Sequence, residues 1–212
     1  MKKIILALDV YDFNKAEKLV KETVTYVDVY KVGPMLFLRC GGRIMRTIKD
    51  NGKEIFLDLK FHDIPAIVKL SVESAKELGV FSLTVHSVGG KDMLVAATSV
   101  KNRPKIWAVT VLTSQVSSEE EVIKMAKLAR DCGVDGVISS PLEIALIRKE
   151  CGEEFNVVTP GIRLKKVDDD QKRVATPEIA IKEGADFIII GRPILNTVNP
   201  VETLKNIYDK IG

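Results

Sequence analysis

The stretch 54-EIFLDLKFHDIP-65 starts as an apolar run and then places Asp58, Lys60 and Asp63 within six residues. The run Ile55–Leu59 has the composition of a buried strand. Residues 58 and 60 differ by two, so on a regular strand their side chains point to the same side. What a charged group at the end of such a strand can do depends on the fold that surrounds the strand.

Seven other short apolar runs, rich in β-branched residues, resemble this one. Their apolar character is nearly continuous instead of alternating, which is typical of strands that are covered on both faces. We therefore predict eight buried strands, at Ile4–Leu8, Val27–Val32, Ile55–Leu59, Ser82–Val85, Ile106–Leu112, Gly136–Ile138, Asn156–Val158 and Phe187–Ile190.

The segments between these runs carry helix signals. Phe13–Thr23 repeats apolar residues at helical spacing, and Ser117-Ser118-Glu119-Glu120 has the pattern of a capping box that opens a helix over Glu119–Cys132. Gly41-Gly42 interrupts the helix expected after the second strand. Two further helix starts are marked by a cap residue directly before proline, at Thr176-Pro177 and Asn199-Pro200.

Eight strands that alternate with about eight helices predict an α/β fold, a single (β/α)8 TIM barrel. The chain has 212 residues, and roughly 26 residues for each strand–helix unit is the period of a compact barrel. A doubly wound open sheet is the alternative, but no G-x-G-x-x-G follows the first strand. Without a linker, a low-complexity tract or a repeat in the sequence, we expect residues 1–212 to form one catalytic domain.

Composition indicates which partners to expect. The net charge of +3 is small and the charges alternate in sign along the expected helices, which argues against a nucleic-acid partner. No apolar run approaches the roughly 18 residues that a membrane span needs, so we expect no membrane association. Cys40, Cys132 and Cys151 lack CxxC spacing and are expected to be unreactive thiols in a reducing cytoplasm.

Polar residues gather where the predicted strands end, and in this barrel the active site lies at those carboxyl ends. Strand ends can be polar merely because the loops that follow them are exposed to solvent, and we prefer that explanation for His86 and Ser139. In chain order the residues at these ends are Asp9, Lys31, Asp58, Lys60, His86, Thr113, Ser114, Ser139, Pro160, Gly161, Arg163, Gly191 and Arg192.

Solvent exposure of the loops does not explain well why four charged residues directly follow or interrupt apolar runs on strands expected to be neighbours. These residues are Asp9, Lys31, Asp58 and Lys60. An alternation of carboxylates and ammoniums lets each buried charge be compensated by the next one. A lysine among carboxylates stays protonated, because nearby opposite charge favours its charged form. Such a lysine is a proton donor and a poor Schiff-base nucleophile, so we predict that Lys60 acts as an acid.

A second candidate cluster lies late in the chain. The stretch 159-TPGIRLKKVDDDQKRVATP-177 is a long polar loop after the seventh strand and a candidate lid. Gly191 allows close approach of a ligand, and Arg163 and Arg192 supply planar donors for an anion. Because the loops after strands seven and eight form the usual phosphate site of this barrel, the substrate is predicted to be a phosphate monoester.

Other chemistries have weak support. The chain has two histidines and no His/Cys/Glu cluster for zinc, and Ser114 and Ser139 lack the G-x-S-x-G context of a hydrolase. His62 alternates away from Lys60 and is interpreted as a structural or loop residue.

At these residues the sequence resembles a known family. FLDLKFHDIP is similar to the D-x-K-x-x-D-I signature of the orotidine 5′-phosphate decarboxylase family, here Asp58, Lys60, Asp63 and Ile64. ALDV, YKVG, TVLTS, VTPGIR, DQKR and IIIGRPI match that family's other segments in the same order. The resemblance implies a cytoplasmic, homodimeric barrel that converts orotidine 5′-phosphate to UMP and CO₂, the last step of pyrimidine nucleotide synthesis, without metal or organic cofactor.

The resemblance also implies roles for individual residues. The family's charged tetrad becomes Lys31, Asp58, Lys60 and Asp63. In it Lys60 protonates C6 of the pyrimidine, Asp58 lies against the departing carboxylate, and Asp63 enters the partner subunit's site. The resemblance implies further contacts from Asp9 and Lys31 to ribose and from Thr113 to the pyrimidine edge. It also places Ile64 and Pro160 among the substrate-binding residues. The residues implied to bind the phosphate are Arg163, Gln171, Gly191 and Arg192.

Two rival functions remain. The Mg²⁺-dependent hexulose-phosphate synthases and ketogulonate-phosphate decarboxylases share D-x-K-x-x-D, but they lack the PGIR…DQ loop as a nucleotide lid. A catalytically silent phosphate-binding module is a third reading, and the intact tetrad argues against it.

Overall fold

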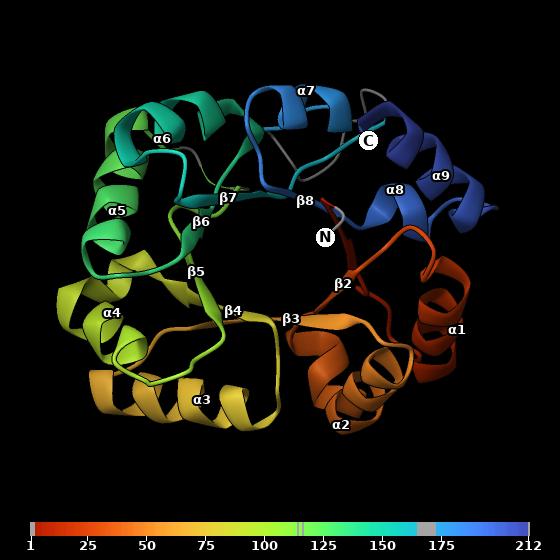
Figure 1. Cartoon of the computed structure of the whole chain (residues 1–212), viewed down its shortest axis with the longest axis horizontal. Coiled ribbons are helices and arrows are strands. Elements are labelled where there is room, and N and C mark those ends of the chain that lie inside the picture. The colour runs from red at the N-terminus through yellow and green to blue at the C-terminus, as the bar shows by residue number, and fades with distance from the viewer. Residues whose placement is uncertain (1–2, 114, 116, 165–172, 212) are drawn as a thin grey trace.

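Eight parallel strands close into a ring in the computed structural model, which describes residues 3–113, 115, 117–164 and 173–211. Each strand pairs with the next along the chain, and β8 pairs with β1, which confirms the predicted barrel and rules out the open sheet (Figure 1). The strands are β1 (Ile4–Ala7), β2 (Val29–Val32), β3 (Glu54–Phe61), β4 (Ser82–His86), β5 (Lys105–Val109), β6 (Gly136–Ile138), β7 (Asn156–Thr159) and β8 (Phe187–Ile190).

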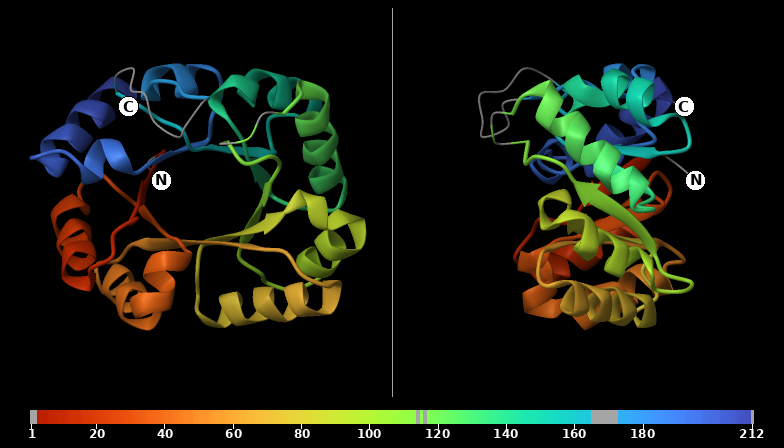
Figure 2. Two further views of the ribbon diagram at one scale, coloured as in Figure 1. Left: turned by 180° about the vertical axis from the view of Figure 1, so that it is seen from behind. Right: turned by 90° about the vertical axis from the view of Figure 1, so that its left-hand side faces the viewer.

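Helices surround this ring and cover its outer face (Figures 1 and 2). Short 3₁₀ turns follow β4 and β6, at Ser87–Gly89 and Pro141–Glu143. The α-helices are α1 (Phe13–Thr23), α2 (Pro34–Asp50), α3 (Pro65–Glu77), α4 (Gly90–Thr98), α5 (Glu119–Asp131), α6 (Ile144–Cys151), α7 (Pro177–Lys182), α8 (Arg192–Leu195) and α9 (Pro200–Ile211).

Most boundaries agree with the sequence signals, and the differences have local causes. Helix α2 is kinked at Cys40, directly before Gly41-Gly42, as the two glycines predicted. The capping box was placed one residue too early, because the N-cap of α5 is Ser118, whose Oγ accepts a hydrogen bond from the Glu121 backbone N–H. The Ser117 hydroxyl instead accepts a hydrogen bond from Arg173, 3.0 Å away.

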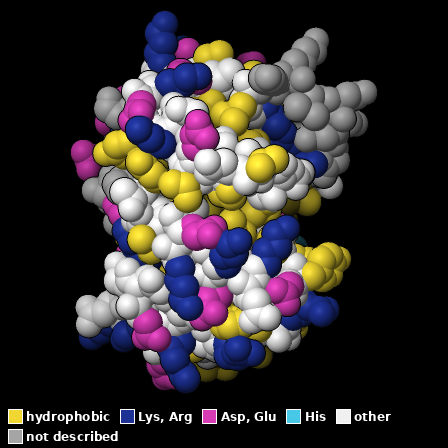
Figure 3. Space-filling model, turned by 90° about the vertical axis from the view of Figure 1, so that its right-hand side faces the viewer, with side chains coloured by type: hydrophobic (Ala, Val, Ile, Leu, Met, Phe, Trp, Pro, Cys, Tyr) yellow, Lys and Arg dark blue, Asp and Glu magenta, His cyan; other side chains and the backbone are white. Residues whose placement is uncertain are grey.

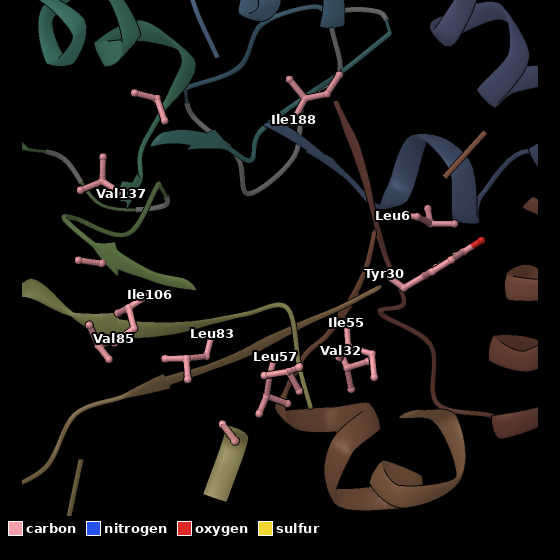
Figure 4. Close-up of a cluster of buried hydrophobic side chains, with 14 of the residues drawn as sticks. Leu6, Tyr30, Val32, Ile55, Leu57, Leu83, Val85, Ile106, Val137 and Ile188 are labelled. Atoms are coloured by element: carbon pink, nitrogen blue, oxygen red, sulfur yellow. The ribbon is translucent and has the colours of Figure 1, made fainter. Parts of the chain in front are cut away.

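Alternate residues of each strand pack into two different layers. One layer faces the helices and forms the larger core, drawn in part in Figure 4, where Leu6, Tyr30, Leu57 and Leu83 belong to it. The other layer faces the barrel axis. Both layers are apolar, so the strands read as continuous hydrophobic runs. The inward-facing apolar residues are Ile5, Ala7, Val29, Phe56, Trp107, Val109, Ile138, Val158 and Ile189.

An aromatic cluster fills the barrel axis. Trp107 packs edge-on against Phe56, with ring centroids 4.7 Å apart, and against Phe81 at 6.0 Å. Phe187 lies 5.5 Å from the Trp107 ring. Phe81 directly precedes β4 and Phe187 starts β8, so the cluster lies toward the amino ends of the strands. The inward-facing residues nearer the carboxyl ends are smaller or polar, and a cavity forms there.

The surface and the thiols bear on the expected partners. On the face shown in Figure 3, Lys and Arg side chains are interspersed with Asp and Glu. In the described ranges, no helix has both the length and the apolar character needed to cross a membrane. Cys40, Cys132 and Cys151 are all unpaired, and burial raises the pKa of each thiol, which agrees with the prediction of unreactive cysteines.

Candidate active site

A cavity of about 290 Å³ opens at the carboxyl ends of the strands. Its apolar wall comes from the inward-facing layer, and its polar groups come from strand ends and the loops that follow them. Most of the predicted strand-end residues are therefore brought together. The lining residues are Ala7, Asp9, Lys31, Asp58, Lys60, Val109, Val111, Leu112, Thr113, Ile138, Pro160, Gly161, Arg163, Ile189, Gly191 and Arg192.

Four charged side chains of alternating sign lie next to one another along one wall of this cavity. The Lys31 ammonium donates to Asp9 Oδ1 at 2.9 Å and lies 3.5 Å from Asp58 Oδ2. The Lys60 ammonium donates to the other oxygen, Asp58 Oδ1, at 2.8 Å. Lys31 and Asp58 are buried, whereas Asp9 is exposed. The predicted alternation of carboxylates and ammoniums is thus present, with Asp58 held between two cations.

This arrangement keeps the buried groups ionised. Burial alone raises the pKa of Asp58, but Lys31 and Lys60 lower it by more, so the pKa of this carboxyl lies below its ordinary value. Burial alone lowers the pKa of Lys31, but Asp58 and Asp9 raise it by more, so its pKa lies above the ordinary value. At neutral pH the site therefore holds fixed charges of both signs, as a preorganised electrostatic site requires.

The contact between Lys60 and Asp58 arises in a different way from the one the sequence suggested. Regular strand alternation does not persist through residue 60, because the pairing of β3 with β4 shifts register between Leu57 and Phe61. Lys60 has a φ of 53°, in the left-handed region that non-glycine residues rarely adopt. The irregular backbone therefore directs the ammonium to Asp58, and irregularities of this kind often redirect a side chain beside an active site.

The predicted anion-binding residues that line the cavity come from the loop after β7 and from the end of β8. Arg163 is only 8% exposed, so it is not an ordinary surface arginine, whereas Arg192 is exposed at the start of α8. Gly161 has a φ of 79°, which favours glycine in the turn after Pro160. Backbone hydrogen bonds between residues 161–163 and Ala175 join the two ends of the loop after β7. Gln171 and Ser114 lie outside the described residues.

Asp63 and Ile64 are not brought into the cavity of their own chain. Both are exposed in the turn between β3 and α3, where Asp63 Oδ1 accepts a hydrogen bond from the Ile64 backbone N–H. Exposed apolar side chains surround this turn, including Ile64 at 64%, Ile67 at 43% and Leu70 at 57%. Of the tetrad, this chain by itself assembles Lys31, Asp58 and Lys60.

The remaining candidates have structural surroundings. The His62 and His86 rings are 5.7 Å apart, and burial followed by the neighbouring His62 and Lys60 lowers the pKa of His86. Neither histidine lines the cavity. Ser139 is fully buried and donates to Glu143. Within the described ranges, no group of three or more His, Cys, Asp or Glu side chains could hold a metal ion.

Two residues near the cavity were missed by the sequence reasoning. Glu143 is buried and accepts hydrogen bonds from the Ser139 hydroxyl and the Ser140 backbone N–H. Its second oxygen pairs with Arg173, which also donates to the Ser117 hydroxyl and thereby links the loops after β5, β6 and β7. Ser140-Pro141-Leu142-Glu143 is a capping box that the sequence did reveal in principle. Arg173 stands in the DQKR motif, but no local pattern indicates its partner.

The position of this cavity places the chain among the (β/α)8-barrel enzymes, whose active sites lie at the carboxyl ends of the strands. The chain belongs to the orotidine 5′-phosphate decarboxylase / HUMPS family, whose sequence model matches residues 2–207. It is similar to the orotidine 5′-phosphate decarboxylases of Geobacter sp. (strain M21), at 42% identity with 100% of this chain and 96% of that one covered, and of Syntrophomonas wolfei, at 44% with 99% and 97% covered.

Solved structures agree with this assignment. The crystal structure of orotidine 5′-phosphate decarboxylase from Lactobacillus acidophilus matches with a TM-score of 0.84 and 31% identity, covering 100% of both chains. The enzyme of the same name from Pyrococcus horikoshii OT3 matches with a TM-score of 0.82 and 30% identity, covering 98% of both.

The Glu143–Arg173 pair predicts a loss of stability. Glu143→Gln keeps the shape of the side chain but leaves the mostly buried Arg173 guanidinium without a counter-charge. We expect the free energy of unfolding to fall by about 2 kcal/mol, the range for hydrogen bonds to charged groups. Urea unfolding measures this change. Glu150→Gln is the matched control, because Glu150 pairs with Lys127 at the surface and such pairs contribute little. Equal effects of the two substitutions would contradict the prediction.

Proposed function

We propose that this chain decarboxylates orotidine 5′-phosphate to UMP and CO₂, in pyrimidine nucleotide synthesis, with Lys60 as the proton donor. Membership of the family and the similarity to decarboxylases over the whole chain support the activity. The observation that carries the assignment of Lys60 is its ammonium, which lines the cavity and lies 2.8 Å from the buried Asp58 carboxylate.

The chemistry needs such a group. Loss of CO₂ from C6 leaves an electron pair in the plane of the pyrimidine ring, where no carbonyl can delocalise it. The protein must therefore stabilise the negative charge electrostatically and supply a proton at the same carbon. An ammonium fixed by a carboxylate does both: its charge opposes the developing carbanion, and its proton is transferred to C6 to form UMP. The neutral amine that remains can recover a proton from water after product release.

The other residues divide between the reacting end and the phosphate end. Asp58 fixes Lys60 and lies beside the departing carboxylate, while Lys31 and Asp9 bind ribose hydroxyls and Thr113 binds the pyrimidine edge. Binding of the remote phosphate supplies energy that assembles the reacting end. The phosphate is held by Arg163, Gln171, Gly191 and Arg192, with Pro160 in the cavity wall.

A homodimer completes the site in this proposal, because Asp63 and Ile64 serve the cavity of the partner subunit. Asp63 is exposed and lies away from its own cavity, and the exposed Ile64, Ile67 and Leu70 around it supply apolar surface for a partner. The three unpaired cysteines agree with a reducing cytoplasm, where we place the protein. We treat residues 1–212 as one catalytic domain that works without cofactor.

The Mg²⁺-dependent enzymes with the same signature remain the rival function, since the family also includes the HUMPS enzymes. The decarboxylase similarities over nearly full length favour the cofactor-free reaction. Complete loss of turnover after treatment with EDTA, with recovery on adding Mg²⁺, would favour the rival.

Lys60→Ala is expected to lower kcat at least a hundredfold, because general acid catalysis typically contributes 10²–10⁴-fold. The matched control is Lys53→Ala. Lys53 pairs with Asp28 3.1 Å away at the opposite end of β3, and its loss should leave kcat unchanged. The assay is the absorbance change of orotidine 5′-phosphate, with circular dichroism to show that both variants fold. Retention of more than about a hundredth of wild-type turnover would refute Lys60 as the acid.

The shared site predicts complementation between two inactive variants. A mixed dimer of Lys60→Ala and Asp63→Ala chains has one cavity in which both residues are intact, if Asp63 acts across a two-fold interface. After unfolding and refolding of an equal mixture, activity should return to about a quarter of wild type, because half the dimers are mixed and each has one working site. No recovery would show that Asp63 does not act in the partner's site.

The phosphate contacts predict a dependence on substrate. Arg192→Ala should lower kcat/KM for orotidine 5′-phosphate by about 10- to 100-fold, and Gln171→Ala should lower it less, because charged contacts to phosphate are the stronger ones. Both should change little on orotidine, which has no phosphate. Arg46→Ala, on the exposed face of α2, is the control. Equal fractional losses on the two substrates would show that these residues do not hold the phosphate.

A further inference from the structure

One buried hydroxyl contacts both the backbone of Lys60 and the side chain of Asp58. Thr84 lies in the middle of β4 and is 0% exposed. Its Oγ1 accepts a hydrogen bond from the Lys60 backbone N–H at 2.9 Å and donates one to Asp58 Oδ1 at 3.0 Å. Asp58 Oδ1 is also the oxygen that accepts from the Lys60 ammonium.

The pairing of β3 with β4 explains why a side chain is needed here. Leu57 pairs with Leu83 and Phe61 pairs with Val85, so three residues of β3 lie opposite Thr84 alone. Lys60, the last of the three, has its left-handed φ of 53°, a conformation that costs a non-glycine residue roughly 1 kcal/mol. Its backbone N–H donates to the Thr84 hydroxyl, which lies on the neighbouring strand. The hydroxyl thus satisfies a donor that the irregular pairing leaves over.

The direction of the hydroxyl proton follows from its two partners. A backbone N–H can only donate, so it occupies a lone pair of Thr84 Oγ1. An ionised carboxylate can only accept, so the Thr84 proton is directed to Asp58. The result is a closed circuit of three hydrogen bonds that starts at the Lys60 amide and ends at the Lys60 ammonium. The first two bonds run in one direction, from the Lys60 amide to Thr84 and from Thr84 to Asp58, and bonds connected in this way polarise and strengthen each other.

We propose that Thr84 is a positioning residue for the decarboxylation, which holds the Lys60 ammonium and the Asp58 carboxylate in their reacting geometry through this circuit. The inference rests on the proposed role of Lys60 as the acid. Thr84 does not line the cavity, so it acts through these two residues and does not touch the substrate. Without its hydroxyl the strained turn at Lys60 loses its anchor and Asp58 loses one of its donors. The ammonium then samples positions farther from C6, and small displacements of this kind are costly for the chemical step.

Substitutions at Thr84 distinguish the effect of its hydroxyl group from the effect of its packing. Thr84→Val keeps the β-branched shape and removes only the hydroxyl, whereas Thr84→Ser keeps the hydroxyl and removes the methyl. Thr110→Val is the matched control, because Thr110 is also buried, directly after β5, and donates to the Ile138 backbone oxygen instead of to a charged side chain. Steady-state kinetics on orotidine 5′-phosphate give kcat and KM for each variant, and urea unfolding gives their stability.

We expect Thr84→Val to lower kcat by roughly 10- to 100-fold, the effect of losing a hydrogen bond to a charged group. KM should stay within about threefold, because most of the binding energy comes from the remote phosphate end. Thr84→Ser should keep kcat within about threefold of wild type, since hydroxyl geometry is retained. Thr110→Val should leave both constants unchanged even if it destabilises the barrel equally. This split between kcat and KM, with rescue by serine, is not expected of a residue that only supports folding.

Three results would overturn the proposal: a kcat for Thr84→Val within threefold of wild type, no rescue by serine, or an equal loss of kcat in Thr110→Val. If Thr84→Val does not fold, the pair Thr84→Ala and Thr84→Ser, which differ by one oxygen, decides the question, and equal kcat values refute the role. The outcome is separable from the proposed function. An active Lys60→Ala variant refutes the acid itself, whereas an inactive Lys60→Ala with a fully active Thr84→Val refutes only the role of Thr84.

Discussion

A buried carboxylate between two ammoniums is the constraint on which the site depends. Asp58 faces the inside of the barrel, where an isolated charge is strongly disfavoured. Lys31 and Lys60 compensate it from two sides, and Asp9 in turn compensates Lys31. Removing any one of these groups takes a counter-charge away from its neighbour, so the four charges depend on one another. The same mutual compensation raises the pKa of Lys31, and it places the Lys60 ammonium beside Asp58, where the proposed reaction needs it.

The barrel makes this unit possible by dividing its interior along the axis. Near the amino ends of the strands, the aromatic cluster around Trp107 fills the space and provides stability. Near the carboxyl ends the side chains are smaller or charged, and loops from several strands surround a cavity of modest volume. Apolar packing near the amino ends therefore stabilises the barrel, and the charged residues of the site lie at the carboxyl ends, as is usual in this fold.

Irregular backbone positions the residues of the site as much as the regular strands do. In a regular β3 the backbone N–H of residue 60 would face β2, as does that of Glu54, which donates to the Asp28 backbone oxygen. The observed strand shifts register, turns Lys60 into a left-handed conformation and gives its N–H to Thr84. Strain of this type persists where surrounding contacts hold it in place. On the other side of the cavity, Glu143 and Arg173 similarly tie three loops together.

The sequence by itself determined the class of fold, the number and order of the strands, four helix starts and the charged residues of the cavity. These features are encoded by near neighbours along the chain, through periodicity, caps and the signature Asp58, Lys60 and Asp63. The tertiary structure decided which residues meet. Thr84 lies inside an apolar run and gives no local signal, and Glu143 and Arg173 are 30 residues apart in the chain. Even the Lys60–Asp58 contact, expected from alternation, depends on a register shift. That shift is set by pairing with a strand 24 residues farther on, because the geometry of a closed ring is a property of all its strands together.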